Sequence, residues 1–248
     1  MKTVFINCSP KKRFCASAYF LFLQRLFTGG EKVNETLRTP ADHARILEQL
    51  RDAQAVVFGV PLYVDGVPSH VLRFMEEMET FCRGNGLKFS VYCIANNGFI
   101  EGKQNEPLMQ VFGHFCTRAG LVFGGGVGIG GGVMLNVTRI LFIVDIVLLL
   151  LNTVLSAANT GSFFPKEAWI SFAENAALLL YFNLGVLFYL AGMGRAIRRG
   201  AFFGKKYTRI LIPSFVFILF ADIFFIIISV LEGGIFRGWL ARKEFGKS

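Results

Sequence analysis

Three apolar segments in the C-terminal half constrain this chain more than any other feature. They cover residues 140–158, 175–193 and 210–231, and each contains few charged side chains. A helix rises 1.5 Å per residue, so about 20 apolar residues cross the ~30 Å hydrocarbon core of a membrane. Three such runs so close together leave too little polar surface to coat a soluble domain. The sequence therefore predicts an all-α transmembrane region of about three helices within residues 136–248.

The basic residues predict which side of the membrane each loop occupies. The loop after the first run holds one lysine, whereas the segment after the second run holds six basic residues: Arg195, Arg198, Arg199, Lys205, Lys206 and Arg209. Short cytoplasmic loops carry the excess of Lys and Arg. We therefore expect a multi-pass protein of the cell membrane whose N-terminal half is cytoplasmic. The tail conflicts with three crossings, because it carries Arg237, Arg242, Lys243 and Lys247; a third segment that turns back near Pro213 and Asp222 is the alternative.

Charge and cysteine content exclude two other classes of protein. The net charge is +9, but the basic residues flank apolar segments and do not form a folded basic face, so we expect no nucleic-acid partner. The five cysteines lie in the first half without a C-x-x-C motif or a Cys/His cluster: Cys8, Cys15, Cys82, Cys93 and Cys116. Such a scattered, odd set is typical of reduced thiols and predicts neither a disulfide framework nor a metal site.

Two acidic residues lie within the apolar runs. Ionisable groups at membrane depth are costly, and Asp145 and Asp222 are therefore candidate functional residues. Asn152 and Ser156 share a helical face with Asp145. Two interpretations stay open: hydrogen bonds that hold helices together, and a role with protons, ions or a quinone.

The first 135 residues alternate between strand and helix patterns. Short strands are predicted at residues 2–7, 53–60 and 87–95, a poorly defined one before Thr39, and a last one from Leu121. Helices are predicted between them, at residues 17–27, 41–52, 67–81 and 106–119. This alternation predicts a parallel, doubly wound α/β sheet, in which ligands bind beyond the carboxyl ends of the strands.

Three loops at predicted strand ends carry the candidate binding chemistry. SPKKRFCAS (residues 9–17) precedes a helix, where N–H groups and hydroxyls suit a phosphate group. PLYVDGVP (residues 61–68) offers the Tyr63 ring for stacking on a planar ligand. NNGFIEG (residues 96–102) offers amides, and Gly98 permits a close approach of the backbone. We expect no general base, and we interpret Asp65 and His70 as a solvated loop acid and a helix-surface histidine.

The segment GGGVGIGGG (residues 124–132) contains a G-x-G-x-x-G match. A dinucleotide-binding fingerprint lies on the first strand of a βαβ unit and is followed by an acid about 20 residues later. Here the match follows the last predicted strand, and the next acid is Asp145 inside an apolar run. We therefore interpret the glycines as the exit from the sheet and a hinge into the first membrane segment.

The loops NCSPKKRFCAS and VFGVPLYVDGVPSHVLRFME resemble those of the flavodoxin-like NAD(P)H-dependent FMN reductases. The resemblance covers roughly residues 1–135, which implies an FMN-binding domain with a five-stranded sheet of order 2-1-3-4-5. It implies that the phosphate lies at Ser9, Lys11, Arg13 and Ser17. It places the flavin ring against Pro61, Leu62, Tyr63 and Val64, with its pyrimidine edge at Asn96, Gly98 and Phe99. The chain departs from the family at Phe14, Cys15 and Ala16, where relatives carry hydroxyl side chains.

The resemblance and the membrane segments together suggest an oxidoreductase anchored in the lipid bilayer. It is expected to pass electrons from NAD(P)H through FMN to a small-molecule or quinone-like acceptor; homodimerisation is left open. One alternative is a flavin-free regulatory or interaction module on a small membrane bundle. A second is a transporter or channel subunit, motivated by the two intramembrane acids.

Overall fold

The computed structural model describes residues 1–12, 14–161 and 163–231. The predicted phosphate ligand Arg13 and the basic residues of the tail lie outside the described residues. By compactness the chain forms one unit from Met1 to Leu211 and a second that begins at Ile212. A functional boundary after residue 135 remains a prediction.

A parallel sheet of six strands forms the centre of the first unit, in the order β2-β1-β3-β4-β5-β6. The strands are β1 (Lys2–Asn7), β2 (Glu31–Thr36), β3 (Ala55–Pro61), β4 (Ser90–Asn96), β5 (Val122–Gly130) and β6 (Gly204–Arg209). Every residue of β3 is buried, as expected for a central strand covered on both faces. The first five strands have the flavodoxin-like order, which confirms the predicted fold class.

The predicted number of five strands is wrong, because β6 extends the sheet beyond β5. Its sequence, GKKYTR, lies in the basic segment whose charge pattern predicts a loop between membrane helices. An edge strand needs no apolar run, and lysines on such a strand discourage pairing with other chains. The hydropathy pattern therefore contained no signal for this strand.

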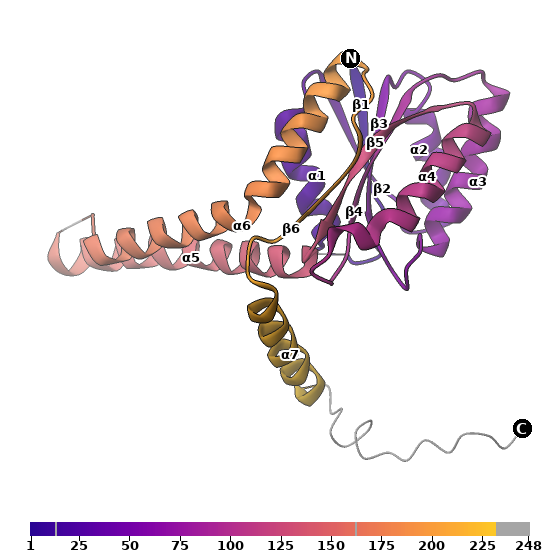
Figure 1. Cartoon of the computed structure of the whole chain (residues 1–248). Coiled ribbons are helices and arrows are strands. Elements are labelled where there is room, and N and C mark those ends of the chain that lie inside the picture. The colour runs from indigo at the N-terminus through magenta and orange to yellow at the C-terminus, as the bar shows by residue number, and fades with distance from the viewer. Residues whose placement is uncertain (13, 162, 232–248) are drawn as a thin grey trace, which may run out of the picture. The chain divides into compact units, whose positions relative to one another are not determined.

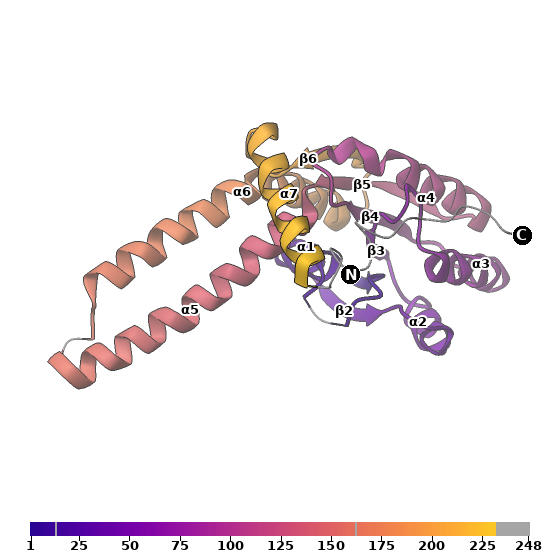
Figure 2. The same cartoon turned by 90° about the horizontal axis from the view of Figure 1, so that it is seen from below.

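Helices cover both faces of the sheet. They are α1 (Ala16–Phe27), α2 (His43–Gln49), α3 (Ser69–Gly84), α4 (Glu106–Ala119), α5 (Gly132–Thr160) and α6 (Lys166–Arg199), with short 3₁₀ turns at η1 (Pro40–Asp42) and η2 (Gly102–Asn105). Figure 1 and Figure 2 show α1 and the last part of α6 on one face, and α2, α3 and α4 on the other. Phe58 and Phe112 pack against each other with ring centres 5.2 Å apart, which joins β3 to α4 in the core.

The glycine-rich segment is a strand and not an exit from the sheet. Residues 124–130 belong to β5, which is paired on both sides, and the chain leaves the sheet at Gly131. A Cβ atom at Gly126 would overlap the carbonyl oxygen of Cys93, and one at Gly130 would overlap that of Ile100. The glycines therefore allow the neighbouring backbone to lie directly against the strand. The interpretation as an exit and hinge was therefore wrong for residues 124–130, whereas at Gly131, with φ 68°, the chain does turn from the sheet into α5.

Among the described residues, three helices are long and apolar enough to cross a membrane: α5, α6 and α7 (Ser214–Leu231). α5 and α6 form a hairpin (Figure 2). Between them the rings of Phe142 and Phe172 stack with centres 5.3 Å apart. The last half of α6 packs on α1, where Arg198 donates a hydrogen bond to the carbonyl of Phe27. The predicted span at 175–193 overlaps this packed half, so residues 166–182 form the largely exposed part of α6.

Glu106 holds β6 against η2 and α4, and this contact predicts a pH dependence. Lys205 and Tyr207 of β6 both hydrogen-bond to its carboxylate. The Lys205 hydrogen bond lowers the pKa of Glu106 from its usual 4.5. A lowered folded-state pKa contributes stability above the unfolded value, and this contribution is lost as the pH falls through the folded value.

We expect Lys205→Met to lower the thermal unfolding midpoint modestly at pH 7, because the substitution removes the charged partner of Glu106. The difference from the wild-type protein should shrink below pH 4.5. Differential scanning fluorimetry in detergent across this range measures both effects. A gap between the two proteins that is equally large at pH 7 and pH 4 would contradict the assignment.

Candidate functional site

A pocket lies at the carboxyl ends of β1, β3 and β4, where the sequence predicted the binding loops. Its cavity volume is about 90 Å³, and it is open on one side. Eight of the predicted residues line it: Ser9, Lys11, Ser17, Pro61, Leu62, Tyr63, Asn96 and Gly98. Val64 and Phe99 do not line it, because their side chains extend into solvent near its mouth. Sequence-distant loops thus meet at one place, as parallel strands require.

The first loop presents a helix N-terminus to the pocket. α1 begins at Ala16, and its N-cap residue, Cys15, provides no side-chain cap. The first N–H groups of a helix have no partner within the helix, and they carry a partial positive charge. Lys11 also lines the pocket, and Arg38 secures the loop by donating hydrogen bonds to the carbonyls of Lys11 and Lys12. This end of the pocket can hold an anion.

The two predicted hydroxyl ligands are engaged within the protein. Ser9 Oγ accepts a hydrogen bond from the backbone N–H of Lys11 at 3.4 Å, and Ser17 Oγ accepts one from Asn96 Nδ2 at 2.9 Å. Both serines are almost fully buried. Each hydroxyl keeps its own proton for donation, and the first N–H groups of α1 also lack partners within their helix.

The second loop is a tight turn with an unusual backbone. Tyr63 and Gly66 form an antiparallel bridge, and Val64 and Asp65 between them have φ angles of 46° and 55°. A β-branched residue in the left-handed region is strained, and such strain is concentrated at functional sites. The turn presents the Tyr63 ring at the pocket mouth. Burial raises the pKa of the Tyr63 hydroxyl, so this group stays protonated at neutral pH.

The third loop contributes two asparagines to the pocket. The side chain of Asn96 ties neighbouring elements together, and that of Asn97 has an oxygen without a partner among the described residues. Asn96 donates hydrogen bonds to Ser17 Oγ and, at 3.1 Å, to the carbonyl of Val60, which ties β4 to α1 and β3. Asn97 Nδ2 donates to the carbonyl of Glu101, whereas Asn97 Oδ1 is buried and has no hydrogen-bond partner in the part of the chain that the structure describes. A buried acceptor without a partner in a pocket wall costs free energy unless a ligand supplies a donor.

The first turns of α5 complete the pocket, which the sequence analysis missed. Val133 and Asn136 line it, and Asn136 Nδ2 donates a 2.6 Å hydrogen bond to the carbonyl of Phe14 in the first loop. Asn136 Oδ1 is a second buried acceptor without a partner among the described residues. The sequence carries no signal that Asn136 belongs to the pocket, because the apolar pattern of this segment predicts only the approach to a membrane helix.

His70, Cys82 and Cys116 have surroundings that do not indicate a catalytic role. His70 was predicted to be a helix-surface histidine; in the structure it is half-buried, and its Nε2 atom lies 3.0 Å from the carbonyl oxygen of Cys8. Burial raises the pKa of Cys82 to about 11 and that of Cys116 to about 12, so neither is a thiolate at neutral pH. Within the part of the chain that the structure describes, no three His, Cys, Asp or Glu side chains lie together as a metal site requires.

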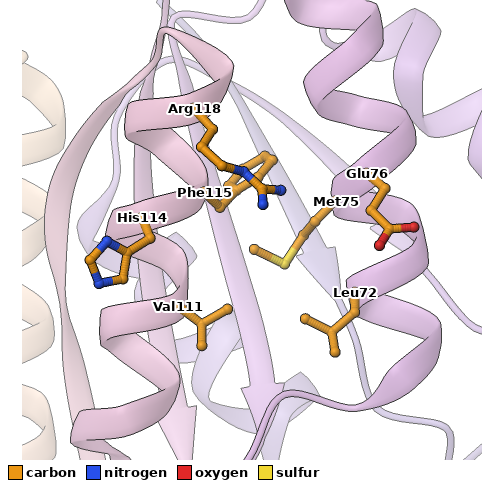
Figure 3. A pocket seen from close by; sticks show the side chains of 7 residues that line it. All are labelled: Leu72, Met75, Glu76, Val111, His114, Phe115 and Arg118. Atoms are coloured by element: carbon orange, nitrogen blue, oxygen red, sulfur yellow. The ribbon is translucent and has the colours of Figure 1, made fainter.

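A larger groove between α3 and α4 does not have the features of this pocket. It has a cavity volume of about 250 Å³ and is lined mainly by apolar side chains, with Glu76, His114 and Arg118 at its rim (Figure 3). Arg118 is already paired with Glu79 through two hydrogen bonds. None of the buried polar atoms without partners lies there among the described residues. The strand-end pocket is therefore the candidate binding site.

No protein-family model matches the chain, and no curated protein matches its sequence. Solved structures resemble about half of it. The Trp repressor binding protein from Bacillus subtilis is 19% identical, with a TM-score of 0.42, over 50% of this chain and 81% of its own. A flavodoxin, WrbA-like protein from Agrobacterium tumefaciens is 14% identical, with a TM-score of 0.40, over 49% and 74% of the two chains. An NAD(P)H:quinone oxidoreductase from Methanothermobacter marburgensis is 14% identical, with a TM-score of 0.40, over 49% and 79%.

Proposed function

We propose that this protein is a membrane-anchored oxidoreductase that binds FMN in the strand-end pocket and passes electrons from NAD(P)H to an acceptor at or in the membrane. The observation that carries the proposal is the composition of the pocket. It combines a helix N-terminus without a side-chain cap, an aromatic ring, and the amide oxygens of Asn97 and Asn136, which are buried and have no partner among the described residues. A phosphate, a planar ring and ring N–H donors are the groups that these features accept.

The residues of this chain divide the binding between them. The N–H groups at the start of α1 and the Lys11 side chain favour the phosphate. Leu62 and Tyr63 supply apolar and aromatic surface for the ring. The Oδ1 atoms of Asn97 and Asn136 can accept hydrogen bonds from N–H groups on the ring edge. FMN supplies hydride acceptance and electron transfer, which no side chain of this pocket provides.

The membrane part of the proposal rests on the three long apolar helices. α5 begins in the wall of the pocket, so a pocket ligand and the start of a membrane helix are direct neighbours. We propose that the domain lies on the cytoplasmic side, which the basic residues after α6 favour. A lipid-soluble acceptor could then be reduced without crossing bulk water.

The test of the proposal is flavin binding by the full chain. The protein, purified in detergent, should show the visible absorption bands of bound flavin, or should gain them when FMN is added. Riboflavin, which lacks the phosphate, should bind more weakly if the α1 N-terminus is used. Absence of flavin after purification, together with no uptake of added FMN, would overturn the proposal.

A flavin-free module is the second candidate, and one observation favours it. The hydroxyls of Ser9 and Ser17 have internal partners, and Phe14, Cys15 and Ala16 bring no further hydroxyl to the phosphate end. In that case the pocket binds no FMN, and the domain acts through its surface. The same absorption experiment separates the two candidates.

Tyr63→Ala is expected to weaken FMN binding about tenfold, because an aromatic contact of this kind contributes about 1.5 kcal/mol. Tyr63→Phe keeps the ring and should bind almost as tightly as the wild-type protein. Titration of FMN fluorescence gives both dissociation constants. Equal affinity of Tyr63→Ala and the wild-type protein would show that the ring does not contact the flavin.

A further inference from the structure

Another cavity lies between the two helices of the hairpin. It has a volume of about 220 Å³ and is lined by Thr138, Leu141, Phe142, Asp145, Asn175, Leu178, Leu179 and Phe182. We call these eight residues the hairpin groove. Five of them have apolar side chains, and the groove opens on the side of the hairpin.

One polar group in the hairpin groove lacks a partner. Asp145 Oδ2 is shielded from solvent and accepts no hydrogen bond from any described residue. The Thr138 hydroxyl cannot serve, because it donates to the carbonyl of Leu135 on its own helix at 2.9 Å. Asn175 lies across the groove on α6 and is exposed. Asp145 and Asn175 are thus the polar side chains available to a ligand in a mainly apolar cavity.

The position of this spot makes the unsatisfied oxygen costly. Asp145 lies in the middle part of α5, a helix apolar and long enough to cross a membrane. At hydrocarbon depth no water is present to hydrogen-bond the carboxyl group, so a partner must come from another helix or a ligand. Apolar walls with a few convergent polar groups are typical of small-molecule sites.

The volume and the polar groups indicate the kind of molecule. Typical small-molecule pockets measure about 300–1,000 Å³, and the hairpin groove, at about 220 Å³, is smaller and open to its surroundings, so it can enclose one part of a ligand while the remainder lies outside. Asp145 Oδ2 needs a hydrogen-bond donor, and the Asn175 amide can donate to the same oxygen atom of the ligand. A ring hydroxyl meets both requirements, and an attached alkyl chain can leave through the open side into lipid.

We propose that the hairpin groove binds a lipid-soluble molecule whose ring carries a hydroxyl group, with that O–H donating to Asp145 Oδ2. Reduced quinones belong to this class. Asp145 lies nine residues after Asn136 on α5, which is about 13 Å along the helix from the strand-end pocket. The identification of this ligand as the reduced electron acceptor rests on the proposed function. The binding of a ring hydroxyl in the hairpin groove does not depend on that function.

The chain carries its own reporter for this site. Trp169 packs edge-on against Phe172 with ring centres 6.2 Å apart, and Phe172 stacks on Phe142 of the groove. Trp239 is the other tryptophan of the sequence, so Trp239→Phe leaves Trp169 as the single fluorophore. Bromine quenches the fluorescence of a nearby indole. The probe is a ring-brominated decylphenol, and its methyl ether, which has no O–H, is the matched control compound.

The experiment titrates both compounds into the Trp239→Phe protein in nanodiscs. The phenol should quench Trp169 saturably, and the ether should need at least a tenfold higher concentration. Asp145→Leu should raise the half-saturating phenol concentration at least tenfold without affecting the ether. Asn175→Leu should raise it by a smaller factor. Asn152→Leu, a polar-to-apolar change on the same helix outside the groove, should leave it unchanged.

Three results would overturn the proposal: equal binding of phenol and ether, equal binding by Asp145→Leu and the wild-type protein, or quenching that never saturates. A change from dimer to monomer in Asp145→Leu would also overturn it, because a second copy would then be the partner of Asp145. Circular dichroism verifies that the variants keep their helices. Repeating the titration with Tyr63→Ala separates this site from the flavin, since phenol binding should persist when FMN binding is weakened.

Discussion

Gly126→Val is expected to destabilise the first unit by at least about 3 kcal/mol, the largest stability effect that we predict for a single substitution. Gly126 pairs with Cys93 on one side and with Lys205 on the other, so its strand cannot move away from one neighbour without meeting the other. A Cβ atom alone would overlap the Cys93 carbonyl oxygen, and valine adds two methyl groups. Both ladders of hydrogen bonds must therefore distort.

Thermal unfolding in detergent, followed by circular dichroism, measures this effect. A loss of this size lowers the midpoint by on the order of 10 °C in a unit of about 200 residues. Gly84→Ala is the matched control, because no atom lies within 4 Å of a Cβ built there and Gly84 ends helix α3. It should be neutral or slightly stabilising. An unchanged midpoint in Gly126→Val would mean that β5 is not a central strand.

Asn136→Leu is expected to weaken FMN binding about 30-fold, the largest effect on the proposed cofactor. The substitution removes the hydrogen bond that fixes the Phe14 carbonyl, and it removes one of the two unsatisfied oxygens in the pocket. Two hydrogen bonds of about 1 kcal/mol each correspond to this factor. The affinity should fall although Asn136 lies on a helix that sequence patterns assign to the membrane.

Two further variants give this prediction its controls. Asn136→Gln keeps the amide oxygen and the N–H donor but lengthens the side chain, so its affinity should be intermediate. Asn152→Leu changes the same residue type further along α5, outside the pocket, and should bind FMN normally. Flavin fluorescence titrations compare all three with the wild-type protein. Wild-type affinity in Asn136→Leu would exclude a role of α5 in the site.

The sequence predicted the core of the fold well, because the relevant signals are local. The continuous apolar run of β3 and the amphipathic pattern of α4 each arise within one element, and α4 begins and ends at the predicted residues. Strand order alone was enough to predict that the loops around Ser9, Tyr63 and Asn96 lie close together. Parallel topology places all carboxyl strand ends at one edge.

The features that escaped prediction depend on contacts between distant segments. Glycine in β5 is disfavoured by strand propensity, and only the backbone of β4 and η2 shows why a side chain is excluded there. β6 is polar and short, and its place is set by the Glu106 contact about a hundred residues earlier. Asn136 joins the pocket only because α5 starts beside the loop that follows β4, where Gly132 N–H donates to the Asn97 carbonyl.

The pairing of β5 with β6 imposes a parity rule on the chain. The two strands exchange backbone hydrogen bonds from Gly125 to Gly130, so they must be in the same compartment. The chain between β5 and β6 must therefore cross a bilayer either not at all or an even number of times, whatever the distribution of Lys and Arg in its loops. The ribosome also completes the hairpin before it makes β6, and β5 keeps an open edge until then. The sheet therefore cannot be completed until the hairpin has been synthesised, and a truncation within the hairpin should leave the sheet without β6.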